Sequence, residues 1–124
     1  MKIGIDFHGV IEEYPEFFSE FTQAMIAFNH EIHIITGSKE KDISAFLFEH
    51  KIGYTHFYSI TDDLLNENNW YKRDSNDNLI FNDYKWNTAK ALYCNKNDIT
   101  LMFDDSDIYS KYFNTAYCKW EKIK

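Results

Sequence analysis

The sequence lacks any apolar run of the roughly 18 residues that a membrane-spanning helix requires. Its N-terminal apolar run is interrupted at Asp6, before it reaches the length of a signal-peptide core. Basic residues are also scarce, with 13 Lys and Arg against 20 Asp and Glu and a formal net charge of −7. This deficit argues against the broad basic surface that binds duplex nucleic acid. We therefore expect a soluble, cytoplasmic protein whose partners include neither a membrane nor duplex nucleic acid.

Cysteine and proline are scarce as well, with two Cys and one Pro in 124 residues. Cys94 and Cys118 form no CxxC motif and have no neighbouring His pair, so we expect reduced thiols rather than a disulfide or a zinc site. Aromatic residues make up 19% of the chain, which argues against disorder. The length predicts a single domain over residues 1–124.

Strand and helix patterns alternate along the chain. Apolar runs typical of strands cover residues 3–7, 33–36, 54–60, 99–103 and, as a shorter candidate, 116–120. Helical patterns lie between them; Pro15 suits the first turn of one, and Ser38 and Ser106 are candidate N-caps of two others. Alternating β and α units predict a parallel sheet covered by helices on both faces. The expected fold is an α/β three-layer sandwich with a central parallel sheet of about five strands.

Residues 61–84 interrupt this alternation with a polar segment rich in Asn and Asp, longer than a plain crossover needs. Within it, the short runs NWYK and LIFN flank RDSNDN, which consists largely of turn-forming residues. We expect a small β-hairpin flap here. The alternative is an irregular surface loop.

Polar residues stand where the predicted strands end. Asp6 ends the first strand, Thr36 and Gly37 follow the second, and Asp104 and Asp105 follow the fourth. The carboxyl ends of parallel strands meet at one edge of a sheet, where ligands bind beside helix N-termini, so we expect these residues to converge on one pocket. The alternative for Asp104 and Asp105 is capping of the next helix, and for Thr36 it is a simple strand-end turn.

The residue types at this predicted pocket suit the chemistry of phosphate esters. Phosphoryl transfer requires a fixed nucleophile, a divalent cation and donors that neutralise charge on the phosphoryl oxygens. Asp6 can supply the nucleophile. Asp6, Asp104 and Asp105 can bind Mg²⁺ through hard carboxylate oxygens, and a cation is the simplest reason to gather acids that repel one another.

The order DFHGV, HIITGS, NDYKWNTAKAL and LMFDDSD is similar to the four motifs of the haloacid dehalogenase-like phosphohydrolase superfamily. The resemblance extends from Ile3 to Asp107. It implies a Rossmann-like sheet, an aspartyl-phosphate intermediate on Asp6 and Mg²⁺ as the cofactor. It also implies a minimal cap, because too few residues separate the first motif from the second strand to form a helical cap domain.

The same resemblance assigns roles to individual residues. It implies that the main-chain carbonyl of His8 is a metal ligand, that the Thr36 hydroxyl donates to a phosphoryl oxygen, and that the Gly37 backbone approaches the phosphate closely. Lys85 matches the lysine that neutralises the phosphate and steadies the nucleophile. Lys90, five residues further along the same helix, is the rival, and we favour Lys85 because it lies nearer the helix start. For both, the alternative is a solvated surface lysine.

His8 is the position where the sequence departs from the family, whose phosphatases resemble DxDG where this chain has DFHG. In the family the second Asp protonates the leaving group and later deprotonates water. Imidazole, with an unperturbed pKa of about 6.5, can perform both steps. Three hypotheses follow: a working phosphatase with His8 as acid and base, a slow enzyme whose phosphorylated Asp6 persists, and an inactive domain that binds a phosphorylated ligand or a protein partner.

The remaining histidines show no metal-ligand spacing, and we expect them at the surface or at helix ends: His30, His33, His50 and His56. A response-regulator-like receiver also combines a parallel sheet with clustered Asp, Thr and Lys. It is disfavoured because it places its paired acids after the first strand, whereas here they follow the fourth.

The size of the flap bears on the substrate. A small flap leaves an open pocket that can admit a phosphoprotein or a nucleic-acid end. A nucleotide or sugar phosphate needs the flap itself or a second subunit of a homo-oligomer to enclose it. The acidic net charge favours a small phosphorylated metabolite as the substrate.

Overall fold

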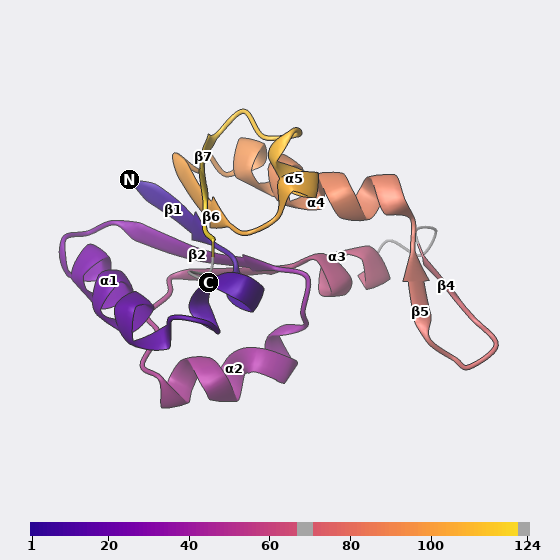
Figure 1. The fold of residues 1–124 in the computed structure, drawn as a ribbon, viewed down its shortest axis with the longest axis horizontal. Coiled ribbons are helices and arrows are strands. Elements are labelled where there is room, and N and C mark those ends of the chain that lie inside the picture. The colour runs from indigo at the N-terminus through magenta and orange to yellow at the C-terminus, as the bar shows by residue number, and fades with distance from the viewer. Residues whose placement is uncertain (67–70, 122–124) are drawn as a thin grey trace.

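The computed structural model describes residues 1–66 and 71–121 (Figure 1). The main sheet consists of β1 (Lys2–Ile5), β2 (Glu31–Thr36), β3 (His56–Ser59), β6 (Leu101–Asp104) and β7 (Ala116–Lys119). The helices are α1 (Pro15–Ala27), α2 (Glu40–Glu49), α3 (Ile60–Asn66), α4 (Asp83–Lys96) and α5 (Asp107–Ser110). A π-type turn, η1 (Phe7–Ile11), follows β1, and a hairpin pairs β4 (Tyr71–Arg73) with β5 (Leu79–Phe81).

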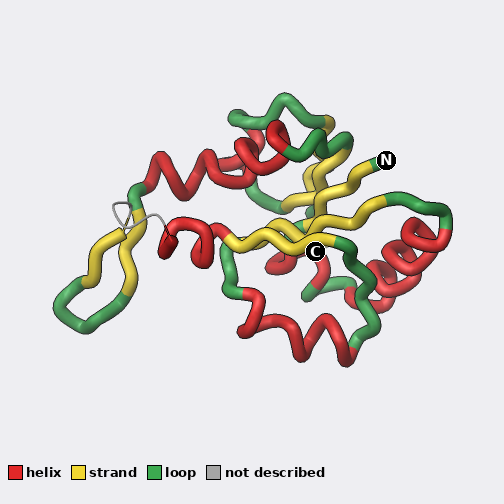
Figure 2. The backbone as a smooth tube through the Cα atoms, turned by 180° about the vertical axis from the view of Figure 1, so that it is seen from behind, coloured by secondary structure: helices red, strands yellow, loops and turns green. Residues whose placement is uncertain are grey.

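The strands of the main sheet are all parallel and lie in the order β3-β2-β1-β6-β7. The chain builds outward from β1 to β2 and β3, and then returns to the other side of β1 with β6 and β7. Helices lie on both faces of the sheet (Figures 1 and 2). The predicted α/β three-layer sandwich with a Rossmann-like parallel sheet is therefore confirmed.

Consecutive residues of β2 serve the cores on the two faces of the sheet, because successive side chains of a strand point to opposite sides. Ile34 is buried in the core that includes Phe18 of α1 and Leu47 of α2. Ile35 is buried in the core that includes Cys94 of α4. Each such side chain contributes about 1.5–3 kcal/mol when fully buried. Packing on both faces fixes the positions of the strand ends.

The hairpin of β4 and β5 projects beyond the main sheet, at the N-terminal end of α4 (Figures 1 and 2). Its turn is organised by Asp74, whose Oδ1 accepts the main-chain N–H groups of Asn76 and Asn78, each at 2.9 Å. Asp77 has a φ of +63°, a left-handed conformation that Asp tolerates. The predicted hairpin is confirmed, although residues 69 and 70 of the NWYK run lie outside the described residues.

One of the two predicted serine caps is observed. Ser106 caps α5, since its Oγ accepts the N–H of Ile108 at 3.2 Å. Ser38 does not cap α2, because the N-cap position is Lys39, whose side chain makes no capping hydrogen bond. The N–H of Glu40, the first residue of α2, donates instead to Asp62 Oδ2 at 3.4 Å. The Ser38 hydroxyl instead lies 2.7 Å from His8 Nε2, so it belongs to the loop network at the strand ends.

Two other expectations are wrong. Residues 61–66 form most of α3 rather than part of the flap, because Ile60 and Leu64 pack in a core that includes Ala89 of α4. His33 was expected at the surface or at a helix end but is only 1% exposed, since it lies within β2 on the face that α4 covers.

The thiol prediction holds for both cysteines: Cys94 is buried, Cys118 is half-buried, and neither forms a disulfide. The longest described helix, α4, has 14 residues. No helix within residues 1–66 and 71–121 is both long and apolar enough to cross a membrane.

Candidate active site

The central strands β1 and β6 bring Asp6 and Asp104 together at the carboxyl edge of the sheet. Asp6 directly follows β1, and its N–H donates to the carbonyl of Phe103 in β6 at 2.9 Å. Asp104 ends β6, and Asp105 is the next residue. The strand order reverses beside β1, so the loops after β1 and β6 diverge and leave a crevice between them. The predicted convergence of these acids is therefore observed.

The turn η1 shapes the loop after β1. The Ile11 N–H donates to the Asp6 carbonyl at 3.4 Å, and the Phe7 N–H donates to Asp6 Oδ1 at 2.8 Å. Gly9 has a φ of +78°, and a Cβ at this position would collide with the carboxylate of Asp105. Glycine is required here both for the left-handed backbone and for the close approach of the β6 loop.

A buried lysine from α4 lies between two of the carboxylates. Lys90 Nζ is 3.0 Å from Asp6 Oδ1 and 2.8 Å from Asp104 Oδ2. Lys90, Asp6 and Asp104 are 2%, 6% and 0% exposed, respectively. A charge buried this deeply is tolerated only when it is paired, so these groups hold one another in place.

Asp6 and Asp104 share this one lysine, so the buried acids outnumber the buried bases. This excess of acids, together with burial, changes the pKa of Asp6. Burial raises the pKa of Asp6 from 3.8 to about 7; Lys90 opposes the rise, and Asp104 and Asp105 add to it. Burial alone would lower the pKa of Lys90, but its attraction to Asp6 and Asp104 outweighs burial and raises it. The site therefore holds more negative charge than Lys90 balances, which favours a bound cation.

The three acids form a candidate cation site. Asp6, Asp104 and Asp105 each offer a carboxylate oxygen, and these oxygens all lie within 4.8 Å of one another. Mg²⁺ prefers hard oxygen ligands at about 2.0–2.1 Å in an octahedron, so ligand oxygens lie about 3 Å apart when adjacent and about 4 Å apart when opposite. The exposed Asp105 carboxylate has room to adjust to such a geometry.

The first prediction concerns this candidate cation site. Asp105→Asn is expected to weaken Mg²⁺ binding at least about tenfold, because the charge of the ligands sets the affinity of an oxygen site. Isothermal calorimetry on the wild type and the variant measures the change. Asp107→Asn is the matched control, since Asp107 lies two residues away and pairs with Lys119 instead. Equal affinities in the wild type and Asp105→Asn would remove Asp105 from the site.

A cavity of about 510 Å³ opens onto the carboxylates of Asp6 and Asp105, and its lining also includes Thr36, Gly37, His8 and Lys90. The Thr36 side chain is fully buried at the end of β2, and its Oγ1 accepts the Ser38 N–H at 3.2 Å. The strand-end turn considered for Thr36 is thus present, and it leaves the hydroxyl proton to donate elsewhere. The phosphate-binding role of Thr36 and Gly37 stays a prediction.

The His8 side chain lies at the rim of this cavity and is 57% exposed. Its Nε2 is 2.7 Å from Ser38 Oγ, and its Nδ1 is 3.3 Å from Glu12 Oε1. A carboxylate beside one ring nitrogen orients the imidazole. Glu12 and Ser38 were not predicted as site residues. The spacing of His8 and Glu12, four residues apart, is the signal that could have indicated the pairing.

The prediction that Lys85 rather than Lys90 lies at the site is wrong, because Lys90 lines the cavity and Lys85 does not. Lys85 lines a different cavity of about 600 Å³ beside α3, together with Tyr58, Asp63 and Tyr93. Five residues of helix advance by about 7.5 Å and turn by about 140°, so the two lysines face different directions. α4 begins beyond the sheet edge, next to the hairpin, and the strand ends lie beside its middle rather than its start (Figure 1).

Trp86 and Tyr109 form an aromatic wall of the cavity that the sequence analysis did not identify. Trp86 Nε1 donates to the Tyr109 hydroxyl at 3.0 Å, and Lys90 Nζ lies 5.0 Å from the centroid of the Tyr109 ring. A Cβ on Gly37 would lie only 2.8 Å from Trp86 Cζ2. Trp86 precedes Lys90 by four residues, and this helical spacing is the signal for their shared face.

Comparisons of the chain with protein-family models, with curated proteins and with solved structures find no match.

Proposed function

We propose that this protein is a Mg²⁺-dependent phosphohydrolase, similar to the haloacid dehalogenase-like superfamily, that hydrolyses phosphate monoesters through an aspartyl phosphate on Asp6. The observation that carries the proposal is the arrangement of Asp6, Asp104 and Asp105 around Lys90 at the switch point of the sheet. Phosphoryl transfer requires a carboxylate nucleophile, hard oxygen ligands and a cation at one place, and this arrangement supplies them.

The first half of the proposed reaction uses Asp6 and His8. The Phe7 N–H and Lys90 hold Asp6 Oδ1, and among the described residues no hydrogen bond reaches Oδ2. Oδ2 attacks phosphorus, the bond between phosphorus and the ester oxygen breaks, and the leaving oxygen takes a proton from protonated His8. The products of this half are the free alcohol and phosphorylated Asp6.

The second half restores the enzyme. Water attacks the phosphorus of phosphorylated Asp6 and gives a proton to neutral His8, while the bond from Oδ2 to phosphorus breaks and inorganic phosphate leaves. Bound Mg²⁺ neutralises charge on the phosphoryl oxygens; Asp6, Asp104 and Asp105 would hold it, with the His8 carbonyl as the ligand that the family pattern implies.

The cavity lining supports a small phosphorylated metabolite as the substrate. We propose the cytoplasm as the compartment of this reaction. The cavity of about 510 Å³ is within the range of small-molecule sites. The Thr36 hydroxyl and Lys90 provide donors for the phosphate, and the wall of Trp86 and Tyr109 provides apolar contact for the remainder of the molecule.

A second candidate is an inactive domain that binds a phosphorylated ligand. The contacts of both His8 ring nitrogens, one with Ser38 and one with Glu12, favour it. An imidazole engaged in this way must break a hydrogen bond before it can transfer a proton to a substrate.

Phosphate release from a panel of sugar phosphates, nucleotides and other monoesters, with and without Mg²⁺, tests the proposed function. At least one ester is expected to be hydrolysed in the presence of Mg²⁺ and not after addition of a chelator. Asp107→Asn should retain this activity. A protein that binds Mg²⁺ and phosphate esters but hydrolyses none of the panel would contradict the proposal and support the binding domain.

The second prediction tests His8 as the proton carrier. His8→Asn is expected to lower turnover by roughly 10²–10⁴-fold, because Asn keeps the loop and its carbonyl but transfers no proton. His8→Asp should retain activity with a more acidic pH optimum, since an unperturbed Asp titrates about 2.6 pH units below an unperturbed His. Turnover measured against pH separates the variants.

His50→Asn serves as the control for this experiment, because His50 ends α2 and does not line the cavity. An active wild type that His8→Asn matches in turnover would show that another group carries the proton. A gain of activity in His8→Asp over an inactive wild type would support the binding domain instead.

A further inference from the structure

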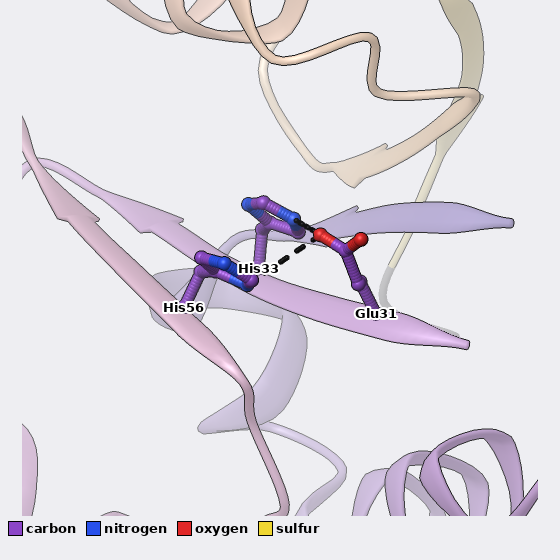
Figure 3. A group of neighbouring side chains, drawn as sticks. All are labelled: Glu31, His33 and His56. Carbon is purple, nitrogen blue, oxygen red and sulfur yellow. Dashed lines mark hydrogen bonds and ion pairs between the residues drawn. The ribbon is translucent and has the colours of Figure 1, made fainter. Parts of the chain in front are cut away.

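A second cluster of ionisable side chains lies on the main sheet, away from the catalytic cavity: Glu31, His33 and His56 (Figure 3). Glu31 and His33 alternate along β2, so their side chains point to the same face. His56 begins β3 and is paired directly with His33 in the register of the two strands. Glu31 is the first residue of β2, whereas the catalytic cavity lies at the opposite end of that strand.

The side chains of this cluster turn their ligand atoms toward one another. Glu31 Oε1 lies 2.9 Å from His33 Nε2 and 3.6 Å from His56 Nδ1, and all three ligand atoms lie within 4.8 Å of one another. A tetrahedral Zn²⁺ ion with bonds of about 2.0–2.1 Å places its ligand atoms about 3.3 Å apart. The two separations that involve Glu31 bracket that value.

Tyr93 of α4 orients the buried member of the cluster. The Tyr93 hydroxyl lies 2.7 Å from His33 Nδ1, on the side of the ring away from Glu31. Without a metal, the Nε2–H of His33 donates to Glu31 Oε1. A metal ion would replace that proton, and an N–H on Nδ1 that donates to Tyr93 would then fix the ring, as the second nitrogen of metal-binding histidines characteristically does.

We propose that Glu31, His33 and His56 form a binding site for a transition-metal ion of the Zn²⁺ type, separate from the acidic site at Asp6. Two imidazoles and one carboxylate are a ligand set that suits Zn²⁺ rather than Mg²⁺, which prefers oxygen ligands alone. Glu31 and His56 are 39% and 50% exposed, so the ion reaches the site from solvent and keeps a position for water. β3 is an edge strand, and the ion ties it to β2.

The rings of His33 and His56 are stacked, with centroids 4.2 Å apart and an angle of 5° between their planes. Two parallel rings do not direct their lone pairs at one point, so metal binding requires one ring to tilt. His33 is held by Tyr93 and by its burial. His56 is half exposed, and its Nδ1 lies 2.9 Å from Thr55 Oγ1, a contact that a bound ion would replace. We expect His56 to turn out of the stack when the ion binds.

Calorimetric titration of the full chain with Zn²⁺, in saturating Mg²⁺ so that the acidic site is occupied, tests this proposal. The wild type is expected to bind one Zn²⁺, and His56→Asn and Glu31→Gln are each expected to weaken binding by at least about tenfold. Tyr93→Phe is expected to weaken it by roughly 10–100-fold, the usual effect of removing a group that orients a ligand. His50→Asn, which changes a histidine outside the cluster, should bind as the wild type does.

None of these variants changes His33, because a substitution at this buried residue could prevent folding. Thermal unfolding without metal checks that each variant folds. Added Zn²⁺ should raise the melting temperature of the wild type and of His50→Asn but not that of His56→Asn. The proposal is overturned by a wild type that shows no saturable Zn²⁺ binding in Mg²⁺, or by His56→Asn or Glu31→Gln that binds as tightly as the wild type. Either result leaves the phosphohydrolase proposal unaffected, because the two sites share no residue.

Discussion

Asp6→Asn is expected to lower turnover by roughly 10⁴-fold or more, the size of loss seen when an enzyme is deprived of its nucleophile. Asn keeps the shape of Asp and the oxygen that accepts from the Phe7 N–H and from Lys90, but its amide does not attack phosphorus. It also removes one of the two buried acids that share Lys90. In Mg²⁺-free buffer at pH 8 the free energy of unfolding should therefore rise by roughly 0.5–2 kcal/mol.

The size of this stability change depends on pH. The folded-state pKa of Asp6 is raised from 3.8 to about 7, so ionisation of Asp6 costs the folded protein stability, and the cost grows as the pH rises between these values. Asp6→Asn should match the wild type below pH 3.8 and exceed it in stability above about pH 7. Urea unfolding at several pH values, followed by tryptophan fluorescence, measures the difference.

Beryllofluoride provides the control for the nucleophile, since it mimics a phosphoryl group on a carboxylate. With Mg²⁺ it should raise the melting temperature of the wild type and of Asp107→Asn, and leave that of Asp6→Asn unchanged. Equal protection of Asp6→Asn would mean that another group accepts the phosphoryl mimic. If Asp6→Asn retained turnover, Asp6 would not be the nucleophile.

Lys90→Met is expected to destabilise the fold by about 3–5 kcal/mol, because it leaves the carboxylates of Asp6 and Asp104 buried without their shared cation. That is a large part of the about 5–15 kcal/mol that a domain of ordinary stability has. Added Mg²⁺ should recover part of the loss, since it supplies positive charge to the same oxygens. Urea unfolding with and without Mg²⁺ is the measurement.

Lys96→Met is the matched control for Lys90→Met, because Lys96 is exposed in the last turn of the same helix. It should change the stability by no more than about 0.5 kcal/mol. Turnover of Lys85→Met, compared with that of Lys90→Met, decides which lysine serves the reaction. A Lys90→Met protein as stable as Lys96→Met in metal-free buffer would show that the buried carboxylates need no counter-ion.

The fold could be predicted from the sequence because each element carries a local signal. Strands β1, β2 and β6 read as apolar runs that end in polar residues, and the hairpin is marked by the turn residues of RDSNDN. α3 was missed because its short amphipathic pattern lies inside a segment whose composition is otherwise that of a loop. The parallel order of the strands then brings Asp6, Asp104 and Asp105 together without further information.

The parts of the site that could not be predicted depend on how elements pack rather than on where they end. Lys85 was favoured because it is near the helix start, but the position of a residue along α4 relative to the strand ends is set by the packing of α3 and the hairpin. The same holds for His33. Its burial follows from the coverage of β2 by α4, and its neighbour His56 comes from a different strand. The spacing of residues along the chain indicates neither the burial of His33 under α4 nor its contact with His56.

Of the strands described, β1 is synthesised first, yet it lies at the centre of the sheet between β2 and β6. Its pairing with β6 joins Ile3 to Leu101, and contacts so distant in sequence form late because the intervening loop must first be closed. A nascent chain that ends before β6 would expose the edge of β1, and the unpaired N–H and C=O groups there can pair with a strand of another chain. Such a chain would hold Asp6 but neither Asp104 nor Asp105, so the site is acquired only as synthesis of the sheet ends.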